Sequence, residues 1–566
     1  MNLIDLYQQK YDELYETGLP EETVQSFKLP IQYIENNEIN SIIKTDLEMP
    51  EIYKNLVGDS ILLDNWSSYY TTNKSFLKDT QSHINSMPKI IIDNSIVDNY
   101  KKFKSETSFI EKYQYIGLKM LKHFNYSSTF LHGLGLYNLA SPVISLLTPL
   151  LVLIVPFIIL KMKGMPITIS LYIEFLKTMI QKNSMYTLFT KFNEITFQQK
   201  MSAIVTIMFY FFQIYSNIMS CISFYKNIHS ISSFLEKYRD HIKKSIENMS
   251  TIQSSIQKYK TYSLFYDEIE NHKIKLNHLH NRLKIIYPFK NTISRISQLG
   301  LIMNLNYEIF MDKEFDKSFM FSVYLNQYIH DIQSMKLLVK NKIHKCKFRK
   351  NTKIEGMYYL PHMNENPVLN DIDLSQNIMI NGPNASGKTT ILKALLINLL
   401  MSQQFGYGCY KKAQVKVYDI FHSYLNIPDT SGRDSLFQAE ARRCKDILVS
   451  IVENPNNSHC CIFDEIYSGT NPTDAVSCAT MYLEEMNKYK SGVDYVLTTH
   501  YIELCELFDD KICNLKMNVN VLDDTIEYLY KIEDGISYVH GGKQVLKDLK
   551  YPLMLNETKN NKNDEK

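Results

Sequence analysis

The sequence predicts an α/β domain with a mostly parallel sheet in the C-terminal part of the chain, preceded by a helical region and an apolar helical hairpin. Strand-like and helical segments alternate from 352 to 552, the pattern of a sheet covered by helices on both faces. Apolar residues recur at three- and four-residue spacing from 227 to 351, which indicates long amphipathic helices. Two long runs without charged residues lie between 126 and 226.

Composition places the chain among globular proteins. It has 566 residues, 45% of them hydrophobic and 22% charged, which is enough for roughly three or four domains. The formal net charge of +2 gives no compositional evidence for nucleic-acid binding. Nine cysteines without a Cys-x-x-Cys pair argue against a disulfide framework or a zinc site and indicate a reducing cytosol. The N-terminus shows no pattern of a cleaved signal.

Composition and spacing divide the chain into five predicted regions. The first of them carries no recognisable chemical motif. In order, they are a mainly helical N-terminal region (1–125), a hydrophobic region (126–226), a helical lever or connector (227–351), a nucleotide domain (352–552) and a disordered tail (553–566).

The hydrophobic region predicts a transmembrane hairpin with both long termini on one side. The uncharged runs cover 27 residues at 134–160 and 25 at 201–225, and roughly 20 suffice to cross a bilayer core. Prolines 142, 149 and 156 interrupt the first run; each would cost about 3 kcal/mol inside a soluble helix, whereas membrane helices tolerate proline more readily.

Two observations weigh against a clean pair of spans, and buried core helices remain the alternative. The connecting segment 161–200 is net positive, although positive segments usually stay on the cytosolic side. The second run is also polar in its middle, at Gln213, Ser216 and Asn217.

The end of the lever is basic between Lys340 and Lys353. Such a run is more often a solvated face than a phosphate contact.

A glycine-containing loop between a strand and a helix predicts a triphosphate site. The apolar run at 378–380 enters a loop that follows the Walker A pattern Gly-x-x-x-x-Gly-Lys-Thr and leaves as a leucine-rich helix. Glycines let the backbone N–H groups approach phosphate, the lysine reaches the β- and γ-phosphates, and the threonine hydroxyl ligates Mg²⁺. The predicted ATP-binding residues are Gly382, Pro383, Asn384, Ala385, Ser386, Gly387, Lys388, Thr389 and Thr390.

A second motif supplies the groups that hydrolysis needs. The apolar run 460–463 ends in Asp464 and Glu465, the Walker B pattern of a buried strand followed by carboxylates. We expect Asp464 to hold Mg²⁺ with Thr389, and Glu465 to act as the general base for the attacking water. A further strand at 493–498 leads to His500, placed to sense the γ-phosphate, although a lone histidine is more often structural.

The segment 429–440 reads as a polar loop that runs into a helix. Ser435 could offer a hydroxyl to a phosphate there, but a capped helix start explains the pattern equally well.

Together these motifs resemble the MutS-like ATPases of DNA mismatch repair, a branch of the ABC-type ATPase group. The matching segments are NGPNASGKTT, SGRDSLFQAE, CCIFDEIYSGTNPTDA and LTTHYIEL, and YKIEDGISYVHGGKQVL is similar to the family's closing segment. The resemblance implies a dimer, a homodimer or a heterodimer with a related ATPase, in which Ser435 contacts the γ-phosphate bound across the dimer. It also implies Mg²⁺-dependent ATP hydrolysis by Lys388, Glu465 and His500, and DNA binding.

The chain also departs from the family pattern. It lacks a recognisable mismatch-reading domain with a Phe-x-Glu wedge, and Asp434 is an extra residue in the signature loop. Ala385 and Ser386 replace the usual Met-Gly, and no aromatic adenine platform is obvious, with Tyr358 or Tyr359 as candidates. With its apolar runs, the chain resembles divergent MutS-like ATPases that carry membrane segments.

Three functions accommodate a phosphate loop in a chain of this kind. The first is a dimeric MutS-like ATPase, membrane-associated with its ATPase domain in the cytosol or else soluble inside the cell. Its role is DNA mismatch repair or, for a membrane-anchored protein, a role other than mismatch repair. The second is the nucleotide-binding half of an ABC-type transporter, which predicts about six spans and an L-S-G-G-Q-type signature that the sequence lacks. The third is a membrane-attached scaffold that binds nucleotide without appreciable turnover, against which the pair Asp464 and Glu465 argues.

Overall fold

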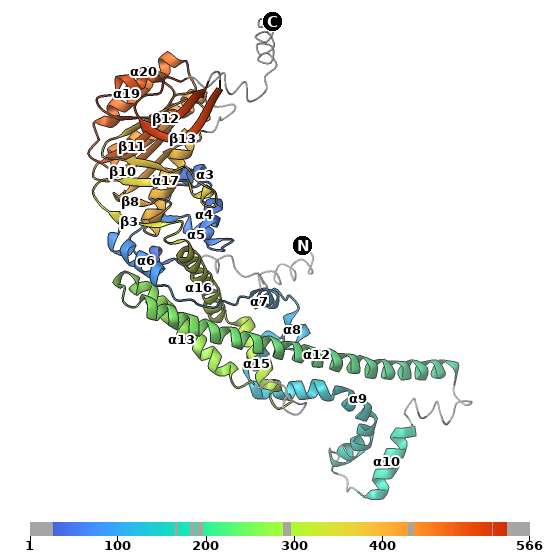
Figure 1. The fold of residues 1–566 in the computed structure, drawn as a ribbon. Coiled ribbons are helices and arrows are strands. Elements are labelled where there is room, and N and C mark those ends of the chain that lie inside the picture. Colours follow the sequence, from blue (N-terminus) through green and yellow to red (C-terminus); the bar gives the residue numbers. More distant parts are fainter. Residues whose placement is uncertain are drawn as a thin grey trace, which may run out of the picture. The chain divides into compact units, whose positions relative to one another are not determined.

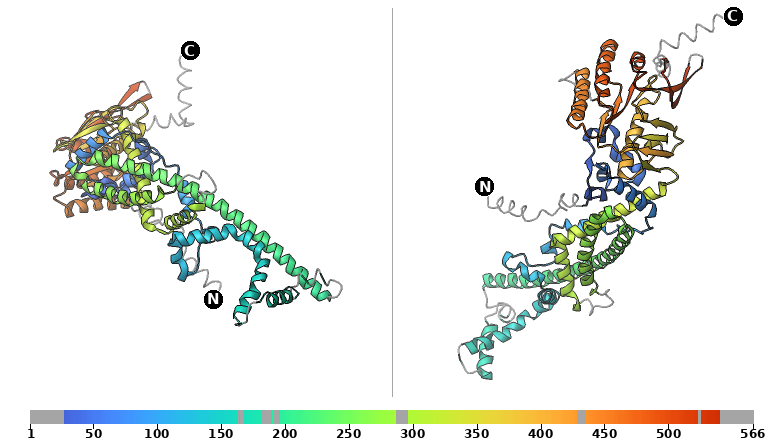
Figure 2. Two further views of the ribbon diagram at one scale, coloured as in Figure 1. Left: turned by 90° about the horizontal axis from the view of Figure 1, so that it is seen from below. Right: turned by 90° about the vertical axis from the view of Figure 1, so that its left-hand side faces the viewer.

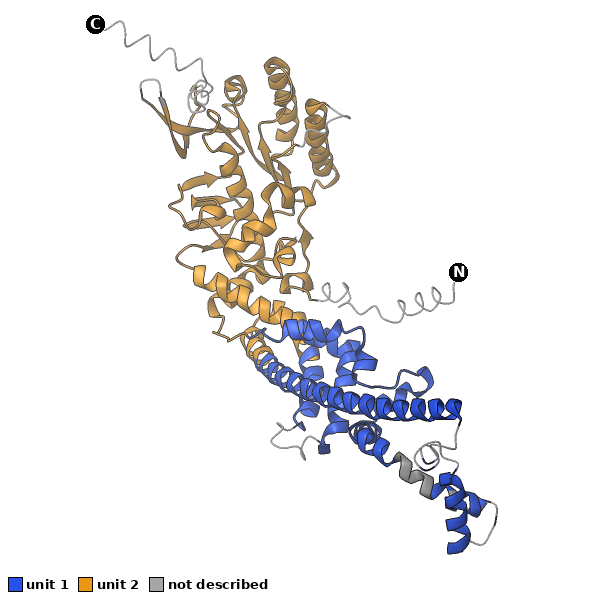
Figure 3. Ribbon diagram, turned by 90° about the vertical axis from the view of Figure 1, so that its right-hand side faces the viewer, with its two compact units in different colours: residues 1–26, 93–247, 272–321 blue, residues 27–92, 248–271, 322–566 orange. Residues whose placement is uncertain are grey.

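The structure is a computed structural model, and it divides into two compact units (Figure 3). It describes residues 27–162, 164, 168–181, 186, 190, 196–286, 296–427, 435–522 and 525–539. Within these, one unit comprises residues 93–247 and 272–321, and the other comprises residues 27–92, 248–271 and 322–539. The predicted tail 553–566 and the loop 428–434 with Asp434 lie outside the described residues, and the bounds of the five predicted regions stay predictions.

The larger sheet of the second unit has six strands in the order β13-β12-β6-β11-β10-β9. Its central strands run parallel, and only β13 pairs in the antiparallel sense. Central strands such as β10 are buried along almost their whole length, because helices cover parallel sheets on both faces. The strands are β6 (Ile378–Asn381), β9 (Ile420–Tyr424), β10 (His459–Asp464), β11 (Val493–Thr499), β12 (Cys513–Leu522) and β13 (Thr525–Asp534).

A second sheet of five strands has the order β5-β4-β8-β3-β7. Its strand β3 lies inside the stretch where the sequence predicted helix up to about residue 351. The helical spacing ends at Leu338, and the alternation of exposed lysines with buried Cys346 that follows is that of an extended strand. The strands are β3 (His344–Phe348), β4 (Lys353–Met357), β5 (Asn370–Asp373), β7 (Tyr407–Gly408) and β8 (Lys412–Val415).

The N-terminal segment 27–92 belongs to the same unit as the two sheets. Buried amide side chains at the end of α17 (Lys388–Gln404) hold it: Gln404 donates to the carbonyls of Trp66 (2.8 Å) and Tyr69 (2.7 Å), and Thr71 donates its N–H to the Gln403 carbonyl (3.0 Å). The remaining elements of this unit are η1 (Pro30–Tyr33), β1 (Asn37–Glu38), α3 (Ser41–Leu47), α4 (Met49–Val57), α5 (Leu63–Trp66), β2 (Tyr69–Tyr70), α6 (Lys74–Ser86), η3 (Lys260–Tyr262), η4 (Leu360–His362), α18 (Leu436–Glu453), α19 (Pro472–Asn487) and α20 (Ile502–Leu507).

The other unit is helical in its described residues. Its core includes the stacked rings of Tyr100 and Tyr238, and Lys104 forms a buried ion pair of 2.5 Å with Asp316. Figures 1 and 2 show α12 as one long helix. The helices are α7 (Val97–Lys104), α8 (Phe109–Lys112), η2 (Lys119–Tyr126), α9 (Ser128–Met162), α10 (Ile169–Gln181), α12 (Phe197–Ile256), α13 (Ser263–Leu283), α15 (Leu299–Met311) and α16 (Lys313–Leu338), and parts of α12, α13 and α16 fall in the sheet-containing unit.

Mixed sheets and many helices fit the predicted α/β domain with a helical region. Two helices are long and apolar enough to cross a membrane by length and composition alone: the segment Ser128–Leu147 of α9, and α12. They overlap the runs 134–160 and 201–225 that the sequence singled out.

Candidate functional site

The predicted phosphate loop connects the end of β6 to the start of α17. Gly387 is the N-cap residue of α17 and has φ 95°, and Ala385 in the loop has φ 65°. A side chain on Gly387 would bring its Cβ within 3.1 Å of the Tyr530 ring, so glycine fits here both by conformation and by space. Turns of this kind at the start of a long helix direct backbone N–H groups toward one point, which suits an anion.

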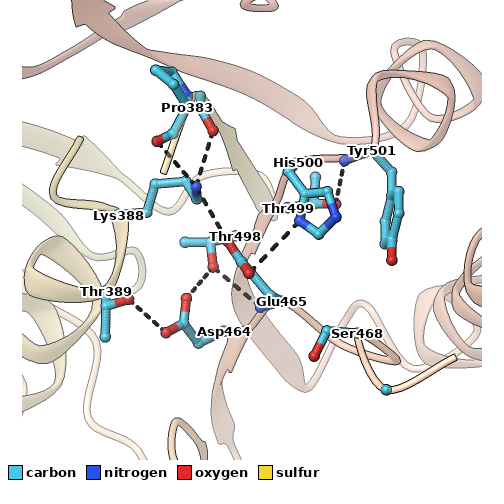
Figure 4. Close-up of polar contacts among 12 residues, drawn as sticks. Pro383, Lys388, Thr389, Asp464, Glu465, Ser468, Thr498, Thr499, His500 and Tyr501 are labelled. Carbon is cyan, nitrogen blue, oxygen red and sulfur yellow. Dashed lines mark hydrogen bonds and ion pairs between the residues drawn. The ribbon is translucent and has the colours of Figure 1, made fainter. Parts of the chain in front are cut away.

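Lys388 is 5% exposed and its ammonium group lies over the loop (Figure 4). Its Nζ donates to the carbonyls of Gly382 (2.9 Å) and Pro383 (3.3 Å) and forms an ion pair with Glu465 Oε1 (3.1 Å). The lysine of Walker A and the second carboxylate of Walker B are therefore in direct contact.

Thr389 and Asp464, the two residues predicted to hold Mg²⁺, lie side by side. Thr389 Oγ1 donates to Asp464 Oδ2 at 2.6 Å, and the Thr498 hydroxyl donates to the other carboxylate oxygen (Figure 4). Burial raises the pKa of Asp464, and these two hydrogen bonds oppose the rise. A hydroxyl and a carboxylate are the hard oxygen ligands that Mg²⁺ prefers, so this pair fits the ion.

Glu465 follows the end of β10 in an unusual backbone conformation. Its φ is 51°, and its N–H donates to the carbonyl (3.1 Å) and the hydroxyl (3.3 Å) of Thr498. A non-glycine residue at positive φ is uncommon and often marks a functional site. The neighbouring His500 imidazole, whose Nδ1 lies 3.6 Å from Oε2, and the charge of Lys388 lower the pKa of Glu465 to about 2.

The four predicted residues Lys388, Asp464, Glu465 and His500 thus meet at the carboxyl ends of neighbouring strands. Thr498 is a site residue that the sequence analysis missed, because a threonine inside an apolar strand has no distinctive signal. The only clue was its place next to the Thr499-His500 pair at the strand end.

A pocket of about 760 Å³ adjoins the loop. Both candidate adenine platforms, Tyr358 and Tyr359, line it. Tyr358 is committed to a hydrogen bond with the Lys342 carbonyl, whereas the Tyr359 ring packs against His362. The pocket is lined by Met357, Tyr358, Tyr359, His362, Glu365, Asn366, Pro367, Val368, Asn370, residues 384–391, Ala394, Asp464, Glu465 and Tyr530.

Ser435 does not lie with these residues in the described part of the chain. It is exposed and caps α18: its hydroxyl accepts the N–H of Gln438 at 3.3 Å, and its own N–H donates to Gln438 Oε1 at 3.0 Å. The alternative of a capped helix start is therefore seen. One turn later, buried Glu440 accepts from Ser468 Oγ (2.9 Å) and the Gly469 N–H (3.1 Å), which ties α18 to the segment after Glu465.

Part of the chain is similar to known proteins. Residues 378–565 match the family model for MutS domain V. The chain is 31% identical over 196 residues to the DNA mismatch repair protein MutS of Desulfatibacillum aliphaticivorans, an alignment that covers 34% of this chain and 21% of the relative. The MutS protein of Bacillus subtilis (strain 168) is 32% identical over 171 residues, 29% of this chain and 19% of the relative.

The chain thus spans about a fifth of the length of the curated relatives it matches. The similarity contains the Walker A loop, the Walker B strand and the segment around His500, and it supports a MutS-like ATPase region. It leaves the helical unit and the N-terminal segment without a counterpart in these matches.

Proposed function

We propose that the chain is a MutS-like enzyme that binds ATP and hydrolyses it with Mg²⁺. The observation that carries the proposal is the meeting of Lys388, Thr389, Asp464 and Glu465 at one end of the sheet. The loop N–H groups and Lys388 bind the phosphates, and Thr389 with Asp464 would hold Mg²⁺, which supplies charge neutralisation at the phosphates. The adenine base then lies in the pocket beside Tyr359.

The contacts of Glu465 define its proposed part in the reaction. Its carboxylate is ionised but engaged by Lys388 and His500, and a pKa of about 2 makes it a weak base in this arrangement. A bound γ-phosphate competes for Lys388 and thereby frees the carboxylate to accept a proton from water. His500 keeps the carboxylate oriented and faces the phosphate.

We propose further that two ATPase domains act as a dimer, formed by two copies or with a related ATPase. The exposed start of α18 at Ser435 supports this part, because a capping serine on the surface is available to a nucleotide bound by another chain. Glu440 would transmit its engagement to the segment that follows Glu465.

The test is a titration with ATP of the wild-type chain and Lys388→Ala. Removal of the ammonium should abolish measurable ATP binding, because a buried cation that faces the β- and γ-phosphates has no substitute in the loop. Lys393→Ala, on the same helix, serves as the control. Equal affinity of the wild type and Lys388→Ala would remove the assignment of the loop.

DNA binding, as in mismatch repair, is a second candidate function. The relatives carry that name, and a surface groove of about 480 Å³ supports it here. Three exposed lysines, Lys258, Lys340 and Lys345, line the groove, and none of its described lining residues is acidic. Such a groove suits a phosphate backbone. Binding to homoduplex and mismatched DNA at several salt concentrations tests this function. The affinity should fall as the salt concentration rises, and an affinity that does not change with salt would contradict it.

We also propose that the protein works at a membrane, with the ATPase domain in the cytosol. The exposed apolar side chains of α9 and of the first half of α12 support this setting. An ABC-transporter role gains nothing from the comparisons, which match MutS proteins.

A further inference from the structure

The first half of α12 carries a straight line of exposed apolar side chains. Successive members are four and three residues apart, so they share one face of the helix. Each is between 40% and 66% exposed, which is unusual for large apolar groups that face water. The line consists of Ile204, Met208, Phe211, Tyr215, Ile218 and Ile222.

Some polar groups of this region lie between the two helices. Asn217 Nδ2 donates to Ser145 Oγ on α9, Tyr210 donates to the Ser145 carbonyl (3.5 Å), and the Cys221 thiol donates to the Leu139 carbonyl (3.4 Å). A helix pair in water has the opposite order, with apolar groups between the helices and polar groups outside. Hydrogen bonds between helices and apolar groups outside are typical of helices in lipid.

The first part of α9 also exposes apolar side chains. Their exposed fractions run from 40% to 60%, so the two helices together present a broad apolar surface. The residues are Leu136, Tyr137, Val143, Ile144, Leu146 and Leu147.

Charge identifies the partner of this surface. The segment 161–200 that joins the two helices has six lysines and two glutamates, and Lys161 and Lys177 are exposed. A second copy packed here in a parallel sense would bring like charges together, whereas a membrane with anionic headgroups attracts them.

A strip of uncharged polar side chains decides how the helices meet the lipid. Ser202, Gln213 and Ser216 are exposed on α12, and Phe209, which is 68% exposed, lies among them on the same face. Gln213 is two residues from Phe211, which places it about 160° around the helix. If α12 crossed the bilayer, these groups would lose water without gaining partners, and the basic segment would have to be translocated. If it lies in the interface, the strip faces the headgroups while the apolar line enters the acyl region.

We infer that α9 and the first half of α12 lie in the cytosolic leaflet of an anionic membrane, inserted by their apolar faces, and do not cross it. The segment 161–200 then stays on the same side as the ATPase domain. This inference rests on the proposed membrane setting and replaces the transmembrane hairpin within it.

The first test is flotation of the full-length protein with vesicles that contain phosphatidylglycerol, and with vesicles of phosphatidylcholine alone. The wild type should float with the former and much less with the latter. The double variant Met208→Glu, Phe211→Glu should lose flotation, because two charges enter the apolar line. Gln213→Glu adds a charge to the polar strip of the same helix and should float nearly as the wild type does. ATP affinity, unchanged in all three, shows that the ATPase domain is folded.

The second test reports which side of the membrane the end of α9 occupies. Met162 is 82% exposed and Met481 of the ATPase domain 69% exposed. Each is replaced by cysteine, and sealed membrane vesicles with the cytosolic side outward receive an impermeant maleimide before and after detergent. The nine native cysteines are buried or half-buried, so they should react weakly, and the labelling of the wild type is subtracted to remove their signal. Met162→Cys should react as fully as Met481→Cys without detergent.

The outcomes separate the inference from the proposals beneath it. Labelling of Met162→Cys only after detergent would overturn the one-leaflet placement and restore a crossing hairpin. Absence of flotation with both vesicles would overturn the placement together with the membrane setting, and would leave the ATPase proposal untouched. Equal loss of flotation in Gln213→Glu and the double variant would overturn the assignment of the inserted face.

Discussion

Replacement of Glu465 by glutamine should change ATP binding and ATP hydrolysis in opposite directions. Glu465 Oε1 forms an ion pair with Lys388 Nζ at 3.1 Å, and the Glu465 and Lys388 side chains are 30% and 5% exposed. An ion pair that is partly open to solvent contributes about 1 kcal/mol. Removal of the carboxylate charge frees the ammonium for phosphate, and about 1 kcal/mol corresponds to roughly fivefold tighter binding of ATP.

Hydrolysis in the same variant should fall by roughly 10²- to 10⁴-fold, the usual contribution of a general base. A fluorescent ATP analogue gives the affinity, and release of phosphate gives the rate. Glu503→Gln is the matched control, because Glu503 is exposed on α20, three residues beyond His500. Weaker ATP binding in Glu465→Gln than in the control, or an undiminished rate, would refute the account of the Lys388–Glu465 contact.

Three further predictions concern other parts of the sheet-containing unit. Tyr359→Ala should weaken ATP binding by about 1 kcal/mol, the usual value of an aromatic contact, and leave inorganic triphosphate binding unchanged; an equal loss for both ligands would exclude base stacking at Tyr359. Ser435→Ala should lower the stability of α18 by about 1 kcal/mol through loss of the cap, and it should lower the hydrolysis rate. If the serine acts across a dimer, addition of Glu465→Gln protein should restore part of that rate, because it offers an intact Ser435 in a mixed dimer. His83 is fully buried, and burial and the charge of Lys258 lower its pKa to about 4. The unfolded chain accepts a proton on His83 near pH 6.5, whereas the folded state accepts it only near pH 4. The contribution of neutral, buried His83 to the free energy of unfolding is therefore complete above pH 6.5. It is lost as the pH falls toward 4, by roughly 3 kcal/mol. The midpoint of urea unfolding should therefore drop with acid less in His83→Phe than in the wild type, and parallel curves would contradict this.

The sequence predicted those parts of the fold and site whose chemistry is local. A strand, a glycine-containing turn and a helix are consecutive in the chain, so the place of Lys388 and Thr389 at the start of α17 followed from their order. The contact between Lys388 and Glu465 did not, because it joins residues 77 positions apart and depends on which strand ends lie next to each other.

Other features depend on tertiary packing that no local pattern encodes. The segment 27–92 looked like a separate region, yet its backbone carbonyls and N–H groups bond to Gln403 and Gln404 at the end of α17. The short strand β3 was hidden behind a run of lysines, whose charge suggested a solvated helix end. Length and composition predicted apolar helices, whereas the direction of Asn217 and of Phe211 required the structure.

Phosphate release from ATP by the purified full-length protein is the most direct test of the central proposal. The measurement compares the wild type with Mg²⁺, the wild type with excess chelator, and Asp464→Asn with Mg²⁺. The Thr389–Asp464 contact predicts steady release that stops with the chelator and falls strongly in Asp464→Asn. Release that persists without Mg²⁺, or that is equal in the wild type and Asp464→Asn, would contradict the assignment of this site as a Mg²⁺-dependent ATPase.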